Sequence, residues 1–542
     1  AMAIGRTFKE ALQKGIRSLE VNRFGIGFGP KDLTETSEDE LTNFIQIPNP
    51  WRLYYIKQAF YQGWSLEKVF KLSFIDKWFL YQIKQLIDFA SEIKLDPSII
   101  KKAKEWGFSD VQISYLTNSS IEDVRHYRKE NNINTTFSLV DTCAAEFEAK
   151  TPYYYSTYES ETEVIPTKNR KIIILGAGPN RIGQGIEFDY CCVHASLNLK
   201  DENIESIMIN SNPETVSTDF DISDRLYFEP LTFEDVLTIY ETEQPEGVII
   251  QFGGQTPLNL ASSLEKAGVK ILGTSSKSIA EAEDRELFKH ILDELDLRQP
   301  NNGIATDKNS AIKIANKIKY PVVVRPSFVL GGASMDIVYN DEDLSSYISK
   351  AKSINTEHPI LIDKYLEKAK ELDVDALSDG KDCVIAGIME HIELAGVHSG
   401  DSACVLPPFS IKEEILNEIR VATKKLAKRL NVIGLLNIQF AIKKDTLYIL
   451  EVNPRASRTV PFISKATGIS WAKLATKVIT GTPLKDLNVS ETIPNYYAVK
   501  EAVLPFNKFP QSDILLSPEM KSTGESMGID KSLPLAFYKS QV

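Results

Sequence analysis

The sequence predicts a multidomain protein that combines α+β and α/β domains. Three observations support this fold class. The chain has 542 residues, enough for about three or four domains at roughly 150 residues each. Apolar residues recur at three- and four-residue spacing from residue 38 to about residue 138, which is typical of helices. From residue 171 onward, short apolar runs alternate with helical patterns, which favours an open parallel sheet.

Composition narrows the class of protein. The net charge of −12 argues against general binding to a nucleic acid backbone. A membrane span needs about 18 consecutive apolar residues, and no run in the sequence approaches that length. No signal peptide pattern opens the chain. The five cysteines are odd in number and show no CxxC spacing, which predicts reduced thiols in a cytoplasmic protein. We therefore expect neither nucleic acid nor membrane partners.

The two ends of the chain show a weak sequence similarity to each other, referred to here as the echo. Met2–Phe8 and Met527–Leu533 match in pattern, and a helical pattern follows Met2–Phe8. Seven conservative matches can also arise by chance. If the echo is a true repeat, residues 1–22 are the tail of an upstream unit, and the chain is one half of a duplicated protein.

Residues 23–150 are predicted to form a helical domain. Asp96-Pro97 and Ser109-Asp110 are typical helix starts. An aromatic stripe (Phe74, Trp78, Phe79, Tyr81) is interpreted as core rather than as a ligand site. Helical bundles of this kind commonly join domains or subunits. Residues 151–169, mostly polar and aromatic, are interpreted as a linker.

Residues 170–280 predict a parallel α/β domain. The buried-type strand 171–175 leads into a glycine-rich turn at 176–185, which can bring backbone N–H groups to an anion. Arg181 stands where a GxGxxG motif needs its third glycine, which disfavours a dinucleotide site. The turns after the next strands, 206–210 and 247–251, are also rich in Gly, Asn, Gln and Thr. A small polar ligand and plain turn chemistry both remain open.

Residues 281–480 carry several polar positions next to apolar strands. Arg325 ends such a strand, which would aim its guanidinium at an anion. The Gly331-Gly332 turn is either a mobile hairpin over phosphates or an ordinary glycine hairpin. Strict alternation puts Glu371, Asp373 and Asp375 on one face, either solvated or facing ribose hydroxyls or cations. A lone histidine such as His398 is usually structural.

Residues 435–455 predict a hairpin with four oxygen-bearing side chains on one face. Asn437 and Gln439 point one way on the first strand, and Glu451 and Asn453 point one way on the second. Carboxylate and amide oxygens suit Mg²⁺ or Mn²⁺. The alternative is the polar outer face of an edge hairpin.

Six segments, taken together and in order, resemble the large subunit of carbamoyl phosphate synthetase: Lys171–Tyr190, Phe252–Pro257, Val324–Ser327, Met389–Glu393, Gly396–Ser402 and Glu451–Phe462. The resemblance covers essentially the whole chain. It implies a helical oligomerisation domain (23–150), a Rossmann-like pre-ATP-grasp domain (170–280), an ATP-grasp domain (281–480) and a C-terminal extension (481–542). From the resemblance we expect no counterpart here of the first ATP-grasp half or of the allosteric domain of the family.

The resemblance also implies roles for individual residues. It assigns nucleotide phosphates to Arg285 and Arg325, and the adenine and ribose side to Lys364, Leu366 and Glu371. It gives the phosphate-side loop to Gly396, Val397, His398 and Ser399, and the divalent metal to Gln439, Glu451 and Asn453. Arg455 and Arg458, with Asn453, are implied as the catalytic set that holds carbamate and the transferring phosphoryl group. Ala333 departs from family members with a basic residue after the two lid glycines.

In this family the second half of the large subunit phosphorylates carbamate to carbamoyl phosphate, for arginine and pyrimidine biosynthesis. The resemblance therefore implies ATP and Mg²⁺ or Mn²⁺, and admits K⁺. It implies three partners: a small glutaminase subunit, an N-terminal half that delivers carbamate through an internal tunnel, and a second copy of the chain in a homo-oligomer. Two alternatives stay open: another ATP-grasp ligase, and a non-catalytic fragment that serves assembly.

Overall fold

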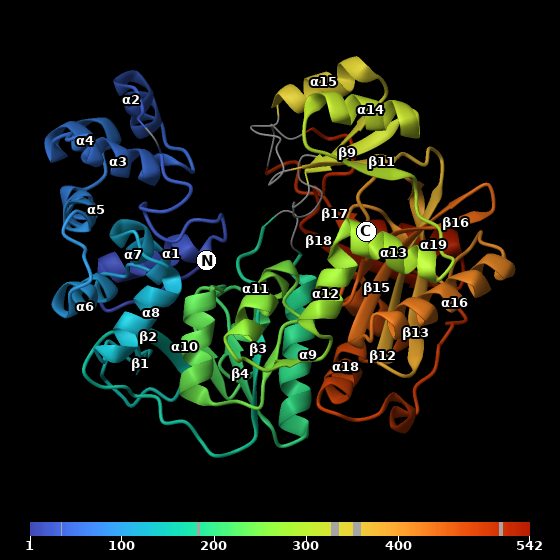
Figure 1. The fold of residues 1–542 in the computed structure, drawn as a ribbon. Coiled ribbons are helices and arrows are strands. Elements are labelled where there is room, and N and C mark those ends of the chain that lie inside the picture. The colour runs from blue at the N-terminus through green and yellow to red at the C-terminus, as the bar shows by residue number, and fades with distance from the viewer. Residues whose placement is uncertain (34, 182–184, 327–334, 351–358, 509–512) are drawn as a thin grey trace. The chain divides into compact units, whose positions relative to one another are not determined.

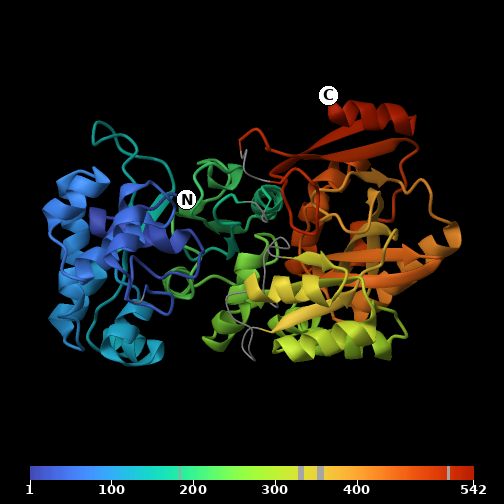
Figure 2. The same ribbon diagram turned by 90° about the horizontal axis from the view of Figure 1, so that it is seen from above.

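A computed structural model of the chain describes residues 1–542 except 34, 182–184, 327–334, 351–358 and 509–512. The chain divides into two compact units (Figures 1 and 2). The first unit contains Ala1–Pro179, Ile204–Glu246 and Ala267–Val269, and the second contains Asn180–Asn203, Gly247–Lys266 and Lys270–Val542. Among the described residues, none of the helices combines the length and the apolar character that a membrane crossing requires.

The first unit begins with eight described helices, blue to cyan in Figure 1: α1 (Phe8–Ser18), α2 (Glu38–Gln46), α3 (Arg52–Tyr61), α4 (Leu66–Ser73), α5 (Lys77–Ala90), α6 (Pro97–Glu105), α7 (Asp110–Thr117) and α8 (Ile121–Glu130). Both predicted helix starts are confirmed. Asp96 accepts hydrogen bonds from the first turn of α6, and Ser109 forms a capping box with Gln112 at α7. A shared apolar core, with Ile56, Leu80 and Phe108 fully buried, holds the helices together.

The aromatic stripe was wrongly predicted to be core. Phe74 is 82 % exposed and Trp78 is 53 % exposed, and Phe79 and Tyr81 are also exposed. A second stripe of α5, centred on Leu80, is buried instead. Both stripes have helical spacing, so periodicity cannot tell which one faces the core. The exposed rings of Phe74, Trp78, Phe79 and Tyr81 are called the aromatic patch below.

The first unit also contains five strands in the order β1-β2-β5-β4-β3. They are β1 (Thr136–Leu139), β2 (Tyr153–Thr157), β3 (Lys171–Leu175), β4 (Glu205–Ile209) and β5 (Arg225–Tyr227), joined by the 3₁₀ helix η1 (Val216–Thr218) and by α10 (Phe233–Glu243). All pairs are parallel except β1–β2, so the parallel α/β prediction is confirmed here. The segment 151–169 differs from a plain linker, because β2 lies within it and pairs on both sides.

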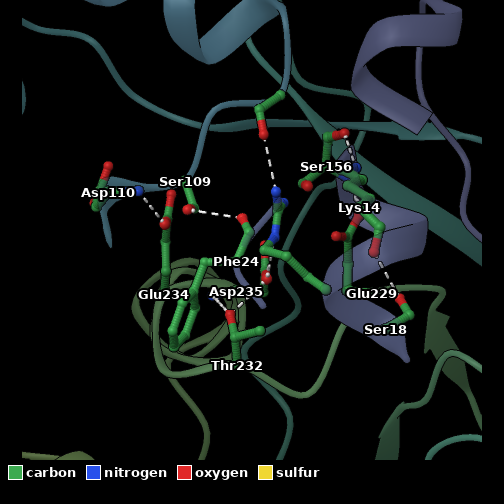
Figure 3. Close-up of polar contacts among 12 residues, drawn as sticks. Lys14, Ser18, Phe24, Ser109, Asp110, Ser156, Glu229, Thr232, Glu234 and Asp235 are labelled. Atoms are coloured by element: carbon green, nitrogen blue, oxygen red, sulfur yellow. Dashed lines mark hydrogen bonds and ion pairs between the residues drawn. The ribbon is translucent and has the colours of Figure 1, made fainter. Parts of the chain in front are cut away.

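A buried network of charges connects α1 with the rest of the first unit (Figure 3). Lys14 lies 2.9 Å from Glu229 and also donates to the backbone carbonyl of Ser156. Arg17 lies 3.6 Å from Asp235, and both side chains are buried. Residues 1–22, expected to be the tail of another unit, therefore contain a helix that is packed into this one.

The same network extends across the helical part of the first unit. Asp110 accepts from Lys104 at 3.0 Å and from Arg128 at 2.6 Å, and Lys104 also binds Glu234. The backbone N–H of Asp110 donates to Glu234 (Figure 3). Lys104 and Glu234, together with Lys14, Arg17 and Asp235, line a small cavity with a volume of about 20 Å³, which is room for one water molecule. Each buried charge has an opposite neighbour, as burial in a low dielectric requires.

The second unit contains three groups of elements. The first group consists of α9 (Glu187–Asp201), β6 (Val248–Ile249), α11 (Gln255–Lys266), β7 (Ile271–Leu272), α12 (Ser276–Glu283) and α13 (Arg285–Glu294). The second is a four-stranded antiparallel sheet, in the order β10-β9-β11-β8, with two helices: β8 (Asn302–Ala305), α14 (Lys308–Ile318), β9 (Val322–Pro326), β10 (Asp336–Val338), α15 (Asp341–Lys350) and β11 (Ile360–Lys364).

The third group is a seven-stranded antiparallel sheet in the order β16-β15-β12-β13-β14-β17-β18, orange to red in Figure 1. Its elements are β12 (Lys370–Asp379), β13 (Cys383–Leu394), β14 (Cys404–Leu406), α16 (Glu413–Arg429), β15 (Ile433–Lys443), β16 (Thr446–Asn453), α17 (Thr459–Thr467), α18 (Trp471–Ile479), η2 (Leu484–Leu487), β17 (Tyr497–Val503), β18 (Gly524–Asp530) and α19 (Leu533–Gln541). Alternate residues of β12 and β15 pack with α16 and α13 in an apolar core. The other face of these strands is therefore available for polar side chains.

Candidate active site

Strands β15 and β16 pair as the predicted hairpin. Gln439 lies opposite Glu451, and Asn437 lies opposite Asn453. Asn453 donates to Glu451 Oε1 at 2.8 Å, and Gln439 donates to Ser399 Oγ at 2.8 Å. Glu451 is exposed, so its carboxylate is accessible to a cation. The three residues assigned to the metal are thus adjacent, and their oxygens are of the type that Mg²⁺ and Mn²⁺ prefer.

Strand β12 pairs with β15, and its polar side chains extend the polar face of the hairpin into the buried part of the sheet. Asp373 pairs with Gln439 and Asp375 with Asn437 along the ladder. Both aspartates are buried, which rules out the solvated-face alternative for them. Asn437, expected to point into the metal patch, donates to Asp375 at 3.0 Å instead. A buried carboxylate requires such donors, so Asn437 serves the aspartates rather than a metal.

Glu371 begins this face, at the position assigned to ribose. Its neighbour is His391 on β13, whose Nδ1 lies 3.8 Å from the Glu371 carboxylate and whose Nε2 lies 2.9 Å from Asp373. Burial raises the pKa of Glu371 to about 7, and Asp373 adds to that shift while His391 opposes it. Sequence reasoning did not predict the contacts of His391 with Glu371 and Asp373, because these partners lie on another strand and no local sequence pattern connects them with His391.

The loop Gly396–Asp401 is fixed by contacts that depend on glycine. Gly396 has φ +114°, and a Cβ there would lie 2.6 Å from the hydroxyl of Tyr365. His398 Nδ1 accepts from the N–H of Gly400 at 3.0 Å. Burial, followed by the charge of Arg458, lowers the pKa of His398 to about 3, so the imidazole is neutral near pH 7. Val397 and Ser399 flank it, and Ser399 is tied to Gln439.

Arg285 and Arg325 meet at a carboxylate that the sequence interpretation overlooked. Arg285, at the first position of α13, donates to Asp363 Oδ2 at 2.8 Å, and Arg325 Nε lies 3.8 Å from the same oxygen. Asp363 belongs to β11, which pairs with β9, the strand of Arg325. Its position near the end of an apolar strand, like that of Arg325, was the available signal.

Lys364 and Leu366 follow Asp363. The Lys364 ammonium donates to the backbone carbonyls of Lys319 and Tyr320 at 2.8 and 3.0 Å. Burial lowers the pKa of Lys364. Leu366 is buried in a small apolar cluster with Ala395. The Lys364 ammonium thus fixes the backbone at Lys319 and Tyr320, in addition to the nucleotide contact that the resemblance implies.

The segment from Asn453 to Thr459 carries the two arginines assigned to catalysis. Arg455 donates to the side-chain oxygen of Asn453 at 3.2 Å and stands over the ring of Phe188. Arg458 contacts the sulfur of Met520. Burial lowers the pKa of both arginines, which remain charged. The guanidiniums are therefore partly desolvated, and a partly desolvated cation attracts an anion more strongly than a solvated one.

The predicted residues thus form two groups. One surrounds Asp363 on the four-stranded sheet, and the other lies on the seven-stranded sheet, from Glu371 to the hairpin and the loop at 396–401. The Gly331-Gly332 turn and Ala333 lie outside the described residues.

Three domain families match the chain in sequence. They are the carbamoyl-phosphate synthetase large chain oligomerisation domain (residues 1–132), the carbamoyl phosphate synthase preATP-grasp domain (168–281) and the carbamoyl-phosphate synthase L chain ATP binding domain (284–487). All three belong to one protein, and they follow one another along this chain. The chain belongs to the carbamoyl phosphate synthase large-chain family.

Curated relatives agree with this assignment. The carbamoyl phosphate synthase large chain of Archaeoglobus fulgidus is 56 % identical over 552 aligned positions, and that of Rhodopirellula baltica is 56 % identical over 559. Each alignment covers 100 % of this chain but only 51 % and 52 % of the relative. The chain therefore spans about half the length of the curated relatives it matches.

Solved structures show the fold. The biotin carboxylase domain of the Hydrogenobacter thermophilus 2-oxoglutarate carboxylase, solved with MgADP, has a TM-score of 0.52 at 20 % identity, over 63 % of this chain and 76 % of that one. An N5-carboxyaminoimidazole ribonucleotide synthetase with ADP has a TM-score of 0.53 at 15 % identity, over 70 % of this chain and 96 % of that one. The predicted fold class, helical followed by ATP-grasp-type α/β domains, is confirmed.

Proposed function

We propose that the chain is the C-terminal half of a carbamoyl phosphate synthase large chain and that it transfers the γ-phosphoryl group of ATP to carbamate, for arginine and pyrimidine biosynthesis. One observation carries the proposal. The oxygen ligands Gln439, Glu451 and Asn453 are adjacent on one hairpin, and Arg455 and Arg458 follow directly on the same chain. Phosphoryl transfer needs these two kinds of group, since it depends on positioning and charge neutralisation.

The nucleotide would be held by both groups of residues. Lys364, Leu366 and Glu371 would hold the nucleoside, and Gly396, Val397, His398 and Ser399 the phosphates, together with Arg285 and Arg325. The donors fit an anion, because Arg325 Nε and Arg455 Nε are buried and lack a hydrogen-bond partner within the described part of the chain. A neutral His398 can donate one N–H to a phosphate oxygen while its Nδ1 accepts from Gly400.

The divalent cation, Mg²⁺ or Mn²⁺, would be bound by Gln439, Glu451 and Asn453, and when bound it supplies charge neutralisation at the phosphates. K⁺ would be a further cation. In the reaction, a carbamate oxygen forms a bond to the γ-phosphorus, and the bond from that phosphorus to the β,γ-bridging oxygen breaks, which releases ADP. Carbamate is already a nucleophile, so the chain needs no serine or cysteine for attack. Arg455 and Arg458 orient carbamate and the moving phosphoryl group.

We also propose partners and a compartment. The half-length match supports an N-terminal half that supplies carbamate, and a glutaminase subunit that supplies ammonia upstream. The match of residues 1–132 to an oligomerisation domain supports a homo-oligomer, and the exposed aromatic patch is apolar surface suited to such contact. None of the five cysteines, all of which lie in the described part of the chain, forms a disulfide, which supports a cytoplasmic location.

The two alternatives are less well supported. Another ATP-grasp ligase would share the sheet and the metal hairpin, but the family matches at 168–281 and 284–487 both carry the synthase name. A non-catalytic assembly fragment would not need the buried aspartates, the neutral His398 and the Arg–Asp–Arg cluster to be intact together.

The test uses the reverse reaction, because carbamate decomposes in water. The purified chain is incubated with carbamoyl phosphate and MgADP, and ATP formation is followed with a coupled assay. ATP formation that requires both substrates and the metal supports the proposal. Nucleotide binding without ATP formation would favour the assembly fragment, and ATP formation from a different acyl phosphate alone would favour another ligase.

A further inference from the structure

Asp375 contacts the segment Asn453–Thr459, which carries the two arginines assigned to catalysis. It stands in the middle of β12 and is 2 % exposed. Its Oδ2 accepts from Thr459 Oγ1 at 2.5 Å, and its Oδ1 accepts from Asn437 Nδ2 at 3.0 Å. One buried carboxylate thus binds two neighbouring elements, β15 and the start of α17.

These contacts fix the residues on both sides of Arg458. Thr459 binds Asp375 directly. Ser457 lies 2.8 Å from the Thr459 hydroxyl, and its Oγ accepts from the Thr459 N–H at 3.2 Å. Arg458 stands between them, so its backbone cannot turn without breaking hydrogen bonds to or near a buried charge.

The other end of the segment is fixed through the same carboxylate. Asn437, the second donor to Asp375, lies opposite Asn453 in the hairpin ladder. Asn453 in turn receives a hydrogen bond from Arg455. Asp375 therefore binds the helix at which the segment ends, and it reaches the strand on which the segment begins through Asn437 on the neighbouring β15.

A purely structural role explains this arrangement poorly. The hydrogen-bond donors to Asp375, from Thr459, Asn437 and Ser457, are neutral, and Asp373 lies on the same face of the strand. Asp375 forms no ion pair within the described part of the chain, although its charge acts on the buried Arg455. Burying a carboxylate in this way is expensive, and an apolar core would hold two elements together at lower cost. A charge-assisted hydrogen bond is shorter and more directional than a neutral one, which suits a group that must fix an angle.

We propose that Asp375 is a positioning residue that holds Arg458 at the angle required for phosphoryl transfer. The proposal rests on the proposed function above. Asp375 acts through Thr459 and Ser457, and its hydrogen bonds within the described part of the chain go to residues outside the nucleotide set. Gly400 supports the same orientation from the other side, because a Cβ at that position would lie 2.7 Å from Arg458 Nη1.

The test compares Thr459→Val with Thr459→Ser in the full chain. Valine keeps the shape and removes the hydroxyl, whereas serine keeps the hydroxyl. A displacement of about 1 Å at a catalytic group can reduce the rate about a hundredfold. We expect Thr459→Val to lower kcat for ATP formation from carbamoyl phosphate and ADP by about that factor, with the KM for ADP within about twofold of wild type, and Thr459→Ser to restore kcat.

Asp375→Asn should have the same effect on kcat and KM. Asp379→Asn is the matched control on the same strand, since Asp379 binds the backbone N–H of Leu484 instead and should leave kcat unchanged. A wild-type kcat in Thr459→Val, or a rise in KM with kcat unchanged, would overturn the proposal.

A crystal structure of Thr459→Val separates this proposal from the proposed function. Its fold is first checked by thermal melting. A shifted Arg458 guanidinium supports the positioning role even if the wild-type chain forms no ATP, a result that would count against the proposed function alone. A guanidinium in its wild-type position would overturn the positioning role whatever the assay shows.

Discussion

Gln439 and Glu451 lie directly opposite each other across β15 and β16. Directly opposite residues in an antiparallel pair have Cβ atoms about 5 Å apart, so both side chains can reach one cation. The bulge in the ladder falls between Gln439 and Phe440, next to this pair. Bulges often occur near active sites, where they redirect a side chain.

Glu451→Gln should weaken binding of a divalent cation while leaving the fold intact. The glutamine retains the volume but lacks the charge that a hard cation requires. We expect the Kd for Mn²⁺, measured by electron paramagnetic resonance in the presence of ADP, to rise at least about tenfold, which corresponds to about 1.4 kcal/mol. Glu491→Gln, which removes a partner of Arg420 instead, should bind Mn²⁺ as wild type does. Equal Mn²⁺ affinity in Glu451→Gln would refute the metal assignment.

Asp363→Asn should weaken nucleotide binding. The change removes the carboxylate shared by Arg285 and Arg325, and an amide cannot hold two guanidiniums in one orientation. Calorimetric titration with ADP should show a Kd about tenfold higher than wild type, equivalent to about 1.4 kcal/mol. Asp336→Asn, an exposed position on β10, is the control. If ADP affinity is unchanged in Asp363→Asn, the two arginines do not act on the nucleotide as a pair.

Nucleotide affinity should depend on pH through Glu371. Its pKa is about 7 in the folded chain, raised by burial from an ordinary value of 4.5. A carboxylate accepts hydrogen bonds from ribose hydroxyls better than a carboxylic acid does, so ADP affinity should rise as pH increases through 7. Glu371→Gln should remove this dependence.

The same shift affects stability in the opposite direction. Between pH 4.5 and about 7 the folded chain holds a proton on Glu371 that the unfolded chain has lost, so this residue lowers the free energy of unfolding as pH rises through that window. Urea unfolding of wild type and Glu371→Gln at pH 5 and pH 8 measures the difference. A Glu371→Gln chain that gains no stability relative to wild type at the higher pH would contradict the raised pKa.

Lys14→Met should strongly destabilise the first unit. The substitution leaves Glu229, which is fully buried, without its cation. Removing one partner of a buried pair typically costs about 3 to 5 kcal/mol. Denaturant unfolding followed by circular dichroism measures the loss. Arg6→Met removes the exposed partner of Glu159 from the turn before the same helix and should have no measurable effect. Similar losses in the two variants would mean that burial of the pair is unimportant.

Sequence reasoning predicted the local features of the site well. Side-chain alternation predicted that Gln439 and Glu451 lie on the polar faces of their strands, and the structure adds that they lie opposite each other. The shared face of Glu371, Asp373 and Asp375 followed from the same rule. The roles of single residues in binding and catalysis remain predictions.

Features that depend on contacts between distant segments could not be predicted. Asp363 binds Arg285 across 78 positions in the sequence, and His391 reaches Asp373 from the neighbouring strand. The interpretation of the aromatic patch as core was wrong for a related reason. The pattern of α5 contains two apolar stripes, and the helices packed against α5 decide which stripe is buried. Residues 1–22 were expected to be the tail of an upstream unit because the two chain ends are similar in sequence, and that similarity says nothing of the buried ion pairs that Lys14 and Arg17 make.

The buried Lys14–Glu229 pair makes the first twenty residues suitable for peptide complementation. A version of the chain that begins after Ser18 would lack the cations next to Glu229 and Asp235, and a synthetic peptide containing α1 could supply them in trans. Because the binding energy would come from a few desolvated ion pairs, complementation should be selective for the lysine and arginine. The first residues of this chain would then act as a separable peptide ligand of its own first unit.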